Sequence, residues 1–286
     1  MTVLPRTVKL HDGRKLSYRL YGNPEGEPVF YFHGYPSSGI EFMLNDANQI
    51  VERLNIKIIA VNRPGYGGSD FQPDRKLLDW PDDVAELADS LGIDRFSVLG
   101  VSGGAPFALA CAYKIPDRLK KAGVACGVGP YDAPAMKKGA SAPILRSPGF
   151  VRKLIMKGFK KMLEQNPEKV AKKMYKRFPE ADQVVLNDPE ARDVLLGALR
   201  EGLRAGTMGA AQDAKIYKSD WGFALQDVKQ KVYLWHGEED LSVRIETGKY
   251  VAGTLKICEA RYYSGEGHFS LIYHHTDEIY GVFAEK

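Results

Sequence analysis

Cysteine is scarce in this sequence, with three residues in a chain of 286. Cys111, Cys126 and Cys258 are odd in number and lie far apart. Neither a disulfide framework nor a cysteine-based metal site is therefore expected, and the three side chains are predicted to be small buried groups. Free thiols are typical of reducing compartments, so we expect a cytoplasmic protein without a structural metal.

Long apolar runs are also missing. A membrane-spanning helix needs about 18 or more consecutive apolar residues, and no run approaches that length. Residues 1–6 do not contain the apolar core of a secretory signal peptide, and the chain has no internal repeat or low-complexity tract. We expect no integral membrane association, and the hydrophobic content of 44% is typical of a globular protein.

A strong charge of either sign is absent as well, because the net charge is +4. The balance is nevertheless uneven. Residues 131–220 contain 18 Lys and Arg against 11 Asp and Glu, a net of +7, which leaves −3 for the remainder. This difference predicts that the middle segment is a separate unit. Its basic residues are expected to form solvated helix faces rather than a nucleic-acid site, and attraction of an anionic substrate or surface is the alternative.

Short apolar runs alternate with helical patterns along most of the chain, which predicts a parallel sheet with right-handed crossovers. A hairpin with a turn at Gly13 precedes this alternation. Eight strands are expected, at residues 7–10, 15–21, 29–32, 56–61, 96–99, 122–126, 232–235 and 259–263. A last helix is expected over residues 271–283.

The alternation stops between residues 129 and 221, where helical patterns dominate and 184–186 is the one strand-like run. One helix is expected over 203–217. We therefore predict a core in two parts, residues 1–128 and 222–286, with an all-helical insertion at 129–221.

The stretch around Ser102 runs from an apolar strand pattern directly into a helical pattern, with Gly100-Val101-Ser102-Gly103-Gly104 between them. A turn this tight brings backbone segments close together, and glycine at 100 and 104 relieves the crowding. The turn holds the hydroxyl of Ser102 above the end of the sheet. Ser102 is therefore a candidate nucleophile.

A serine nucleophile needs a base, and the base needs an acid to orient it. His268 lies in a Gly-flanked loop after a predicted strand, and Asp240 follows the strand at 232–235. The carboxyl ends of parallel strands meet at one edge of a sheet, so these side chains are expected near Ser102. The order Ser, Asp, His belongs to one triad-bearing fold.

Other titratable residues are weaker candidates. Glu238 and Glu239 are rivals to Asp240, whereas His33 and His236 precede glycines and are expected to hydrogen-bond the loops that they begin. Of the remaining histidines, His11 is expected in the hairpin turn, and His274 and His275 are expected in the last helix.

Five motifs together resemble the α/β-hydrolase family, and they follow one another along the whole chain. They are His33-Gly34, Arg63-Pro64-Gly65-Tyr66-Gly67-Gly68-Ser69-Asp70, Gly100-Val101-Ser102-Gly103-Gly104, His236-Gly237-Glu238-Glu239-Asp240 and Gly267-His268. The resemblance implies an α/β fold: a mostly parallel eight-stranded sheet with helices on both faces and an all-helical cap after the sixth core strand. It also implies an oxyanion hole made by the backbone N–H groups of Tyr35 and Gly103.

We predict a serine hydrolase that cleaves a small carboxylic ester or related acyl compound without a metal or organic cofactor. An aminopeptidase or amidase of the proline iminopeptidase type is the alternative, and it would need acidic cap residues such as Glu164, Glu168 or Glu180 to hold a substrate amine. Those peptidases usually carry Gly and Trp where this chain has Val101 and Gly103. A lyase using the same triad and a non-turnover small-molecule sensor are further alternatives, whereas hydrolases with an Asp nucleophile are disfavoured by serine at 102.

Overall fold

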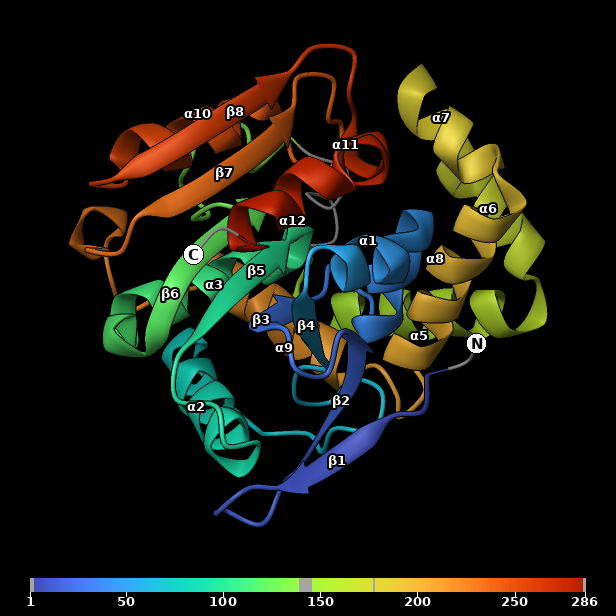
Figure 1. Cartoon of the computed structure of the whole chain (residues 1–286). Helices are drawn as coiled ribbons and strands as arrows, with labels where there is room; N and C mark the ends of the chain where they lie inside the picture. Colours follow the sequence, from blue (N-terminus) through green and yellow to red (C-terminus); the bar gives the residue numbers. More distant parts are fainter. Residues whose placement is uncertain (1–2, 139–145, 177, 285–286) are drawn as a thin grey trace.

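The sheet contains eight strands in the part of the chain that the computed structural model describes, residues 3–138, 146–176 and 178–284. Their order across the sheet is β1-β2-β4-β3-β5-β6-β7-β8 (Figure 1). The strands are β1 (Arg6–Lys9), β2 (Lys15–Gly22), β3 (Glu27–Phe32), β4 (Ile56–Val61), β5 (Phe96–Val101), β6 (Leu119–Ala125), β7 (Val232–Gly237) and β8 (Cys258–Tyr263).

The sheet is mostly parallel, as predicted. β1 pairs with β2 and β2 with β4 in antiparallel fashion, which confirms the predicted hairpin. Every pairing from β4 through β3, β5, β6 and β7 to β8 is parallel. The carboxyl ends of β3, β5 and β7 therefore lie along one edge, where the candidate site residues were expected.

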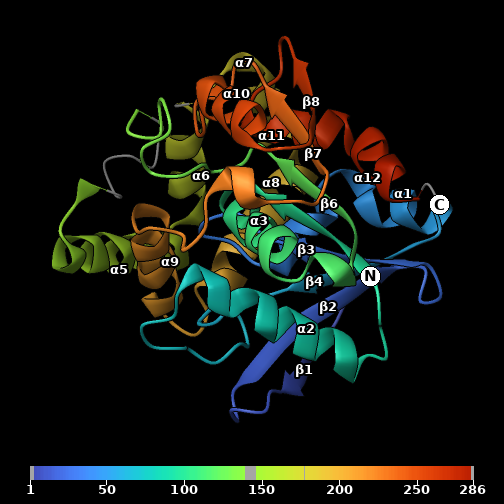
Figure 2. The same ribbon diagram turned by 90° about the vertical axis from the view of Figure 1, so that its left-hand side faces the viewer.

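Successive strand residues point to opposite faces of the sheet. Apolar side chains lie on both faces here, and helices cover both. In β3, Phe30 and Phe32 pack into the cluster shared with α2 (Trp80–Ser90), α3 (Ala105–Lys114) and α10 (Ile245–Thr254). Val29 and Tyr31 pack into the other cluster, with α1 (Ala47–Arg53) and α12 (Thr276–Ala284). Figures 1 and 2 show these two layers on either side of the strands.

Among the described residues between β6 and β7, the regular structure is helical, with α5 (Gly149–Gln165), α6 (Pro167–Tyr175), α7 (Glu180–Asn187), α8 (Pro189–Gly202) and α9 (Met208–Lys218). We call these five helices the insertion. In Figure 1 they lie on the right of the sheet and behind it. Asp188 caps the N-terminus of α8, because its side chain accepts hydrogen bonds from the N–H groups of Glu190 (2.8 Å) and Ala191 (3.0 Å).

Three local expectations differ from the structure. The strand-like run at 184–186 lies inside α7, where Val185 is buried. The helix expected over 203–217 begins at Met208, because Gly206 has a φ of +126°, which no right-handed helix accommodates. The single C-terminal helix is two helices, α11 (His268–His274) and α12, divided at His275.

None of the described helices is both long enough and apolar enough to cross a membrane.

Candidate active site

Ser102 lies at the turn between β5 and α3, and its backbone is left-handed, with a φ of +53°. A serine seldom adopts this conformation, and holding it costs about 1–3 kcal/mol. The turn closes because the flanking glycines lack side chains. A Cβ at Gly100 would lie 2.4 Å from Gly104 O, and one at Gly104 would lie 2.0 Å from Phe32 O.

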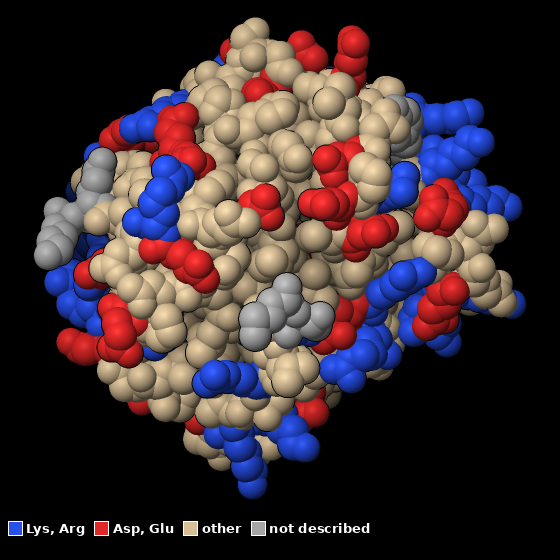
Figure 3. Space-filling view, turned by 45° about the vertical axis from the view of Figure 1, so that its right-hand side comes forward, with Lys and Arg blue, Asp and Glu red and all other residues tan. Residues whose placement is uncertain are grey.

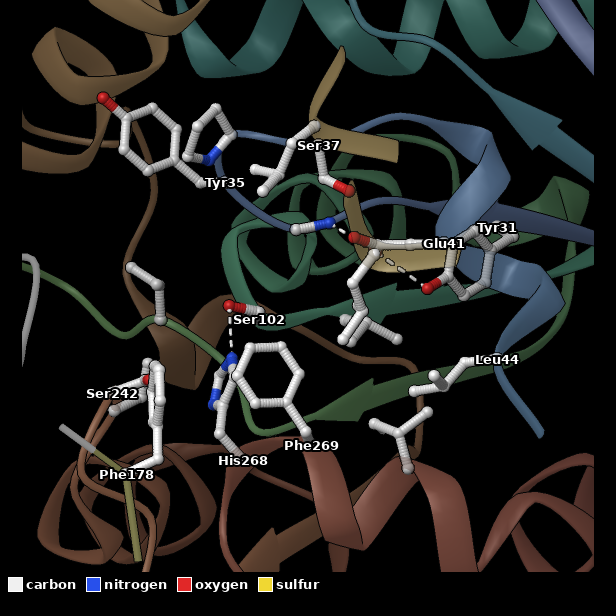
Figure 4. Close-up of a pocket in the computed structure, with 18 of the residues that line it drawn as sticks. Tyr31, Tyr35, Ser37, Glu41, Leu44, Ser102, Phe178, Ser242, His268 and Phe269 are labelled. Atoms are coloured by element: carbon white, nitrogen blue, oxygen red, sulfur yellow. Dashed lines mark hydrogen bonds between the residues drawn. The ribbon is translucent and has the colours of Figure 1, made fainter. Parts of the chain in front are cut away.

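His268 is the first residue of α11, and its imidazole lies between Ser102 and Asp240. Its Nε2 is 3.0 Å from Ser102 Oγ, and its Nδ1 is 2.7 Å from Asp240 Oδ2. Figure 4 shows the imidazole of His268 directed at the hydroxyl of Ser102. Because a carboxylate only accepts hydrogen bonds, Nδ1 carries the proton and Nε2 is free to accept one from Ser102.

Asp240 is held in the loop after β7. Its Oδ1 accepts hydrogen bonds from the N–H groups of Ser242 (2.7 Å) and Val243 (2.9 Å), and the residue is buried. Its second oxygen is therefore left to His268. The structure thus brings together the three residues that sequence spacing singled out from different strand ends.

The pKa of His268 is raised above the ordinary value of an imidazole. Burial lowers this pKa, but it is outweighed by the raising effects taken together, of which the charge of Asp240 and its hydrogen bond are the largest. The charges of Asp182 and Glu41 raise it further. Three carboxylates therefore favour the imidazolium form of His268.

Tyr35 and Gly103 are adjacent in space, as the expected oxyanion hole requires. A Cβ built on Gly103 would lie 3.2 Å from Tyr35 N and 2.6 Å from Tyr35 Cβ. A Cβ on Gly34 would lie 3.4 Å from Ser102 Cβ. The loop after β3 therefore passes directly over the serine turn.

Glu41, from the 3₁₀ helix η1 (Gly39–Asp46), supports this loop. Its Oε1 accepts hydrogen bonds from Gly34 N–H (2.6 Å) and from the hydroxyl of Tyr31 (2.8 Å) (Figure 4). Burial raises the pKa of Glu41, although hydrogen bonds from Ser37, Gly34 and Tyr31 oppose the shift. Sequence reasoning missed this residue, since no motif marks it.

The rival histidines are bonded to their own loops, as expected. His236 Nε2 lies 2.7 Å from Val243 O, and burial lowers the pKa of the ring. His33 Nδ1 lies 2.9 Å from Gly34 O, and its Nε2 accepts from Arg63 N–H at 3.3 Å. Both rings therefore shape the loops that carry candidate site residues.

The remaining rivals lie away from Ser102. Glu238 and Glu239 are exposed. His11 pairs with Glu86, whereas His274 and His275 both lie against Glu266.

Two insertion residues on α9 reach the core loops, and no motif in the sequence marks either of them. The hydroxyl of Tyr217 donates to Gly103 O at 2.8 Å. Asp213 is fully buried and pairs with Arg63 at 2.9 Å and also with Arg75. Arg63 in turn donates to Gly34 O at 2.8 Å.

A cavity of about 280 Å³ opens beside Ser102 and His268. Its wall is mainly apolar and comes from both the sheet loops and the insertion. Phe178 and Phe269 are part of this wall and lie near His268 in Figure 4. The apolar lining residues are Pro36, Leu44, Val101, Val128, Phe159, Phe178, Leu195, Leu199, Val243, Phe269 and Ile272.

Cys126, Asp240 and His268 form a group whose ligand atoms lie within 4.8 Å of one another. The nitrogen and carboxylate of this group are already joined by the 2.7 Å hydrogen bond. Burial raises the pKa of the Cys126 thiol well above its ordinary value, which disfavours the thiolate that a metal needs. We therefore attribute the grouping to close packing around His268.

Most basic residues of the insertion are solvated, as expected, although Arg152 of α5 is buried. Lys and Arg gather at the right-hand edge of Figure 3, the side on which the insertion lies in Figure 1. The exposed lysines of α5 and α6 are Lys153, Lys157, Lys161, Lys169, Lys172 and Lys173.

Comparison with known proteins gives matches over most of the chain. A family profile described as alpha/beta hydrolase fold matches residues 27–275. The bifunctional esterase/perhydrolase of Acinetobacter calcoaceticus is 26% identical over 269 residues, which cover 91% of this chain and 92% of that protein. The proline iminopeptidase of Xanthomonas citri is 32% identical over 111 residues, covering 37% of this chain and 34% of that protein.

Solved structures give the same architecture. A bromoperoxidase from Bacillus anthracis superposes with a TM-score of 0.73 at 20% identity, over 99% of this chain and 100% of that chain. A hydrolase from Pseudomonas aeruginosa PA01 superposes with a TM-score of 0.72 at 17% identity, over 98% of this chain and 97% of that chain. At such identities the likeness concerns the fold alone.

Proposed function

Because the chain belongs to the α/β-hydrolase family, we propose that it is a serine hydrolase of small carboxylic esters or related acyl compounds. The observation that carries the proposal is the chain of hydrogen bonds from Asp240 through His268 to Ser102, beside an apolar cavity. In that arrangement a hydroxyl, a neutral imidazole nitrogen and a buried carboxylate stand in the order that nucleophilic catalysis requires.

Ser102 Oγ attacks the substrate carbonyl while His268 Nε2 takes the hydroxyl proton. Asp240 stabilises the imidazolium and keeps Nδ1 protonated. The N–H groups of Tyr35 and Gly103 bind the negative oxygen of the tetrahedral intermediate. His268 then protonates the leaving alcohol, and the acyl group stays on Ser102.

Water completes the cycle. His268 takes a proton from a water molecule, and the resulting hydroxide attacks the carbonyl carbon of the acyl-enzyme. When the second tetrahedral intermediate collapses, the bond to Ser102 Oγ breaks and His268 returns the proton to that oxygen. The carboxylic acid leaves, and the Ser102 hydroxyl and the neutral imidazole are restored.

The cavity favours a small substrate. Its volume of about 280 Å³ is just below the range typical of ligand pockets, about 300–1,000 Å³. We propose that residues 129–221 act as a cap over this cavity, since Phe159, Leu195 and Leu199 of the insertion form part of its wall. Ester cleavage also accords with the esterase named among the relatives.

The peptidase alternative needs an acidic group to hold the substrate amine. Glu168 and Glu180 are exposed, and Glu164 pairs with Lys160 on the outside of α5. None of these three carboxylates lines the cavity. The carboxylate that does line the cavity, Glu41, already accepts hydrogen bonds from Gly34 N–H and the Tyr31 hydroxyl. The positions of these acids favour an ester over a substrate with a free amine.

The test is turnover of p-nitrophenyl esters of increasing chain length, with a proline naphthylamide as the amide counterpart. Wild-type protein is expected to prefer a short acyl chain, and Ser102→Ala is expected to abolish turnover. Ser90→Ala, at an exposed position of α2, serves as the control and should match wild type. Turnover that survives Ser102→Ala would refute the proposal, and faster cleavage of the amide would favour the peptidase.

A further inference from the structure

Asp182 is a buried carboxylate on α7 that contacts the backbone beside the reacting groups. It is 0% exposed. Its Oδ2 accepts from His268 N–H at 2.9 Å, and its Oδ1 accepts from the N–H groups of Phe269 (2.8 Å) and Ser270 (2.9 Å). One insertion side chain therefore binds three consecutive amides, and the first of them belongs to His268.

The approach of Asp182 depends on the residue before His268. A Cβ at Gly267 would lie 2.5 Å from Asp182 Cγ. Glycine thus leaves the space in which the carboxylate sits. The N–H of Gly267 donates to Ser270 Oγ at 2.8 Å, so the whole turn is fixed by side chains.

Apolar contacts join the same two elements. The rings of Phe178, just before α7, and Phe269 meet edge to face with centroids 5.1 Å apart. Val185 of α7 and Leu44 are buried in one apolar cluster. Phe269 and Ile272 of α11 pack against that cluster. A displacement of α7 would therefore also displace the segment that begins with His268.

We infer that Asp182 is a positioning residue, through which the insertion fixes the backbone of His268 so that the imidazole reaches Ser102 and Asp240 together. This inference rests on the proposed serine hydrolase mechanism. It makes the insertion a part of the reacting arrangement and more than a cover over the cavity.

The charge of Asp182 provides a readout that a purely structural role would not move. The charged and titratable groups around His268 are Asp240 after β7, Asp182 on α7, Glu41 on η1, His236 in β7 and Cys126 after β6. The three carboxylates raise the pKa of His268. Removing the charge of Asp182 should lower that pKa, whereas loss of packing alone would change stability and leave it in place.

The experiment compares Asp182→Asn with Glu180→Gln, which removes one charge from an exposed position of the same helix. Both are assayed with p-nitrophenyl butyrate as a function of pH, and their urea unfolding is measured alongside. For Asp182→Asn we expect kcat to fall by about 10- to 100-fold, the cost typical of a misplaced reacting group, with little change in KM. The acid limb of kcat/KM should move to lower pH. Glu180→Gln should match wild type.

Wild-type kcat and an unmoved acid limb in folded Asp182→Asn would overturn the inference. Should that variant not fold, Asp182→Glu takes its place. The longer side chain does not fit the space beside Gly267 that the Asp182 carboxylate fills. We therefore expect kcat to fall while the acid limb of kcat/KM stays at the wild-type pH, because the charge is kept. A wild-type kcat would overturn the inference.

Ser102→Ala in the same series separates the two proposals. Turnover that survives Ser102→Ala refutes the serine mechanism and the role of Asp182 with it. Loss of turnover in Ser102→Ala combined with wild-type behaviour of Asp182→Asn refutes the positioning role alone.

Discussion

Replacing Asp213 with asparagine leaves two buried guanidinium groups facing a neutral amide. Arg63 is fully buried, and Arg75 is 4% exposed. Both bond to the carboxylate of Asp213, which is itself 0% exposed. The change alters neither the size nor the shape of the side chain, so its effect reports on charge.

The magnitude follows from this burial. Removing one partner of a buried ion pair costs about 3–5 kcal/mol, because the remaining charge is left without compensation in a medium of low dielectric constant. With an m-value of about 3 kcal/mol/M in urea, such a loss lowers the unfolding midpoint by about 1–2 M. A surface ion pair would contribute less than about 1 kcal/mol.

A second effect reaches the candidate site. Arg63 also donates to Gly34 O at 2.8 Å, beside Tyr35, whose N–H is the proposed oxyanion donor. A shifted guanidinium would loosen that loop, so kcat for p-nitrophenyl butyrate should fall as well.

Urea unfolding is followed by the fluorescence of Trp80, Trp221 and Trp235, which are all at most 5% exposed. Asp193→Asn, at an exposed position of α8, is the matched control and should leave the midpoint unchanged. A midpoint of Asp213→Asn within about 0.2 M of wild type, less than 1 kcal/mol at this m-value, would show that the pair contributes no more than a surface one and would refute the reasoning.

Two further predictions concern the serine turn and the imidazole. Gly104→Ala places a Cβ 2.0 Å from Phe32 O, a backbone atom that cannot move aside. The unfolding midpoint in urea should therefore fall by more than the equivalent of about 3 kcal/mol. Gly158→Ala, where a Cβ meets nothing within 4 Å, is the control, and equal stability of the two variants would contradict the crowding. His268 must be neutral to accept a proton, and its pKa is raised above 6.5. We therefore expect kcat/KM to increase with pH and to level off with a midpoint above 6.5, with turnover read at the isosbestic wavelength of p-nitrophenol. A midpoint below 6.5 would contradict the inference that the carboxylates around His268 outweigh its burial.

The sequence was sufficient for residues that lie directly after strands. Ser102, Asp240 and His268 could be placed together because parallel strands bring their carboxyl ends to one edge of the sheet. Local chemistry also predicted the turn at Gly100 and Gly104. These predictions depend on chain connectivity and short-range patterns, which a single sequence contains.

The supporting residues could not be predicted in this way. Asp182, Asp213 and Tyr217 lie on amphipathic helices, where a buried acid and a solvated acid give the same pattern until the helices are packed. Glu180 and Asp182 are two residues apart on α7, yet one is exposed and the other is buried. Gly206, which precedes α9, was visible in the sequence, but its positive φ depends on how the chain turns in space.

The contacts from α7 and α9 limit modular engineering of this protein. Asp182, Asp213 and Tyr217 reach three different loops of the sheet, so a chimera that imports the helices of another hydrolase would lose all three contacts unless the donor supplies equivalents. Point changes in the cavity wall, at Leu195 or Leu199, alter the lining without touching them. Redesign of substrate range should therefore begin with the wall and leave the helices in place.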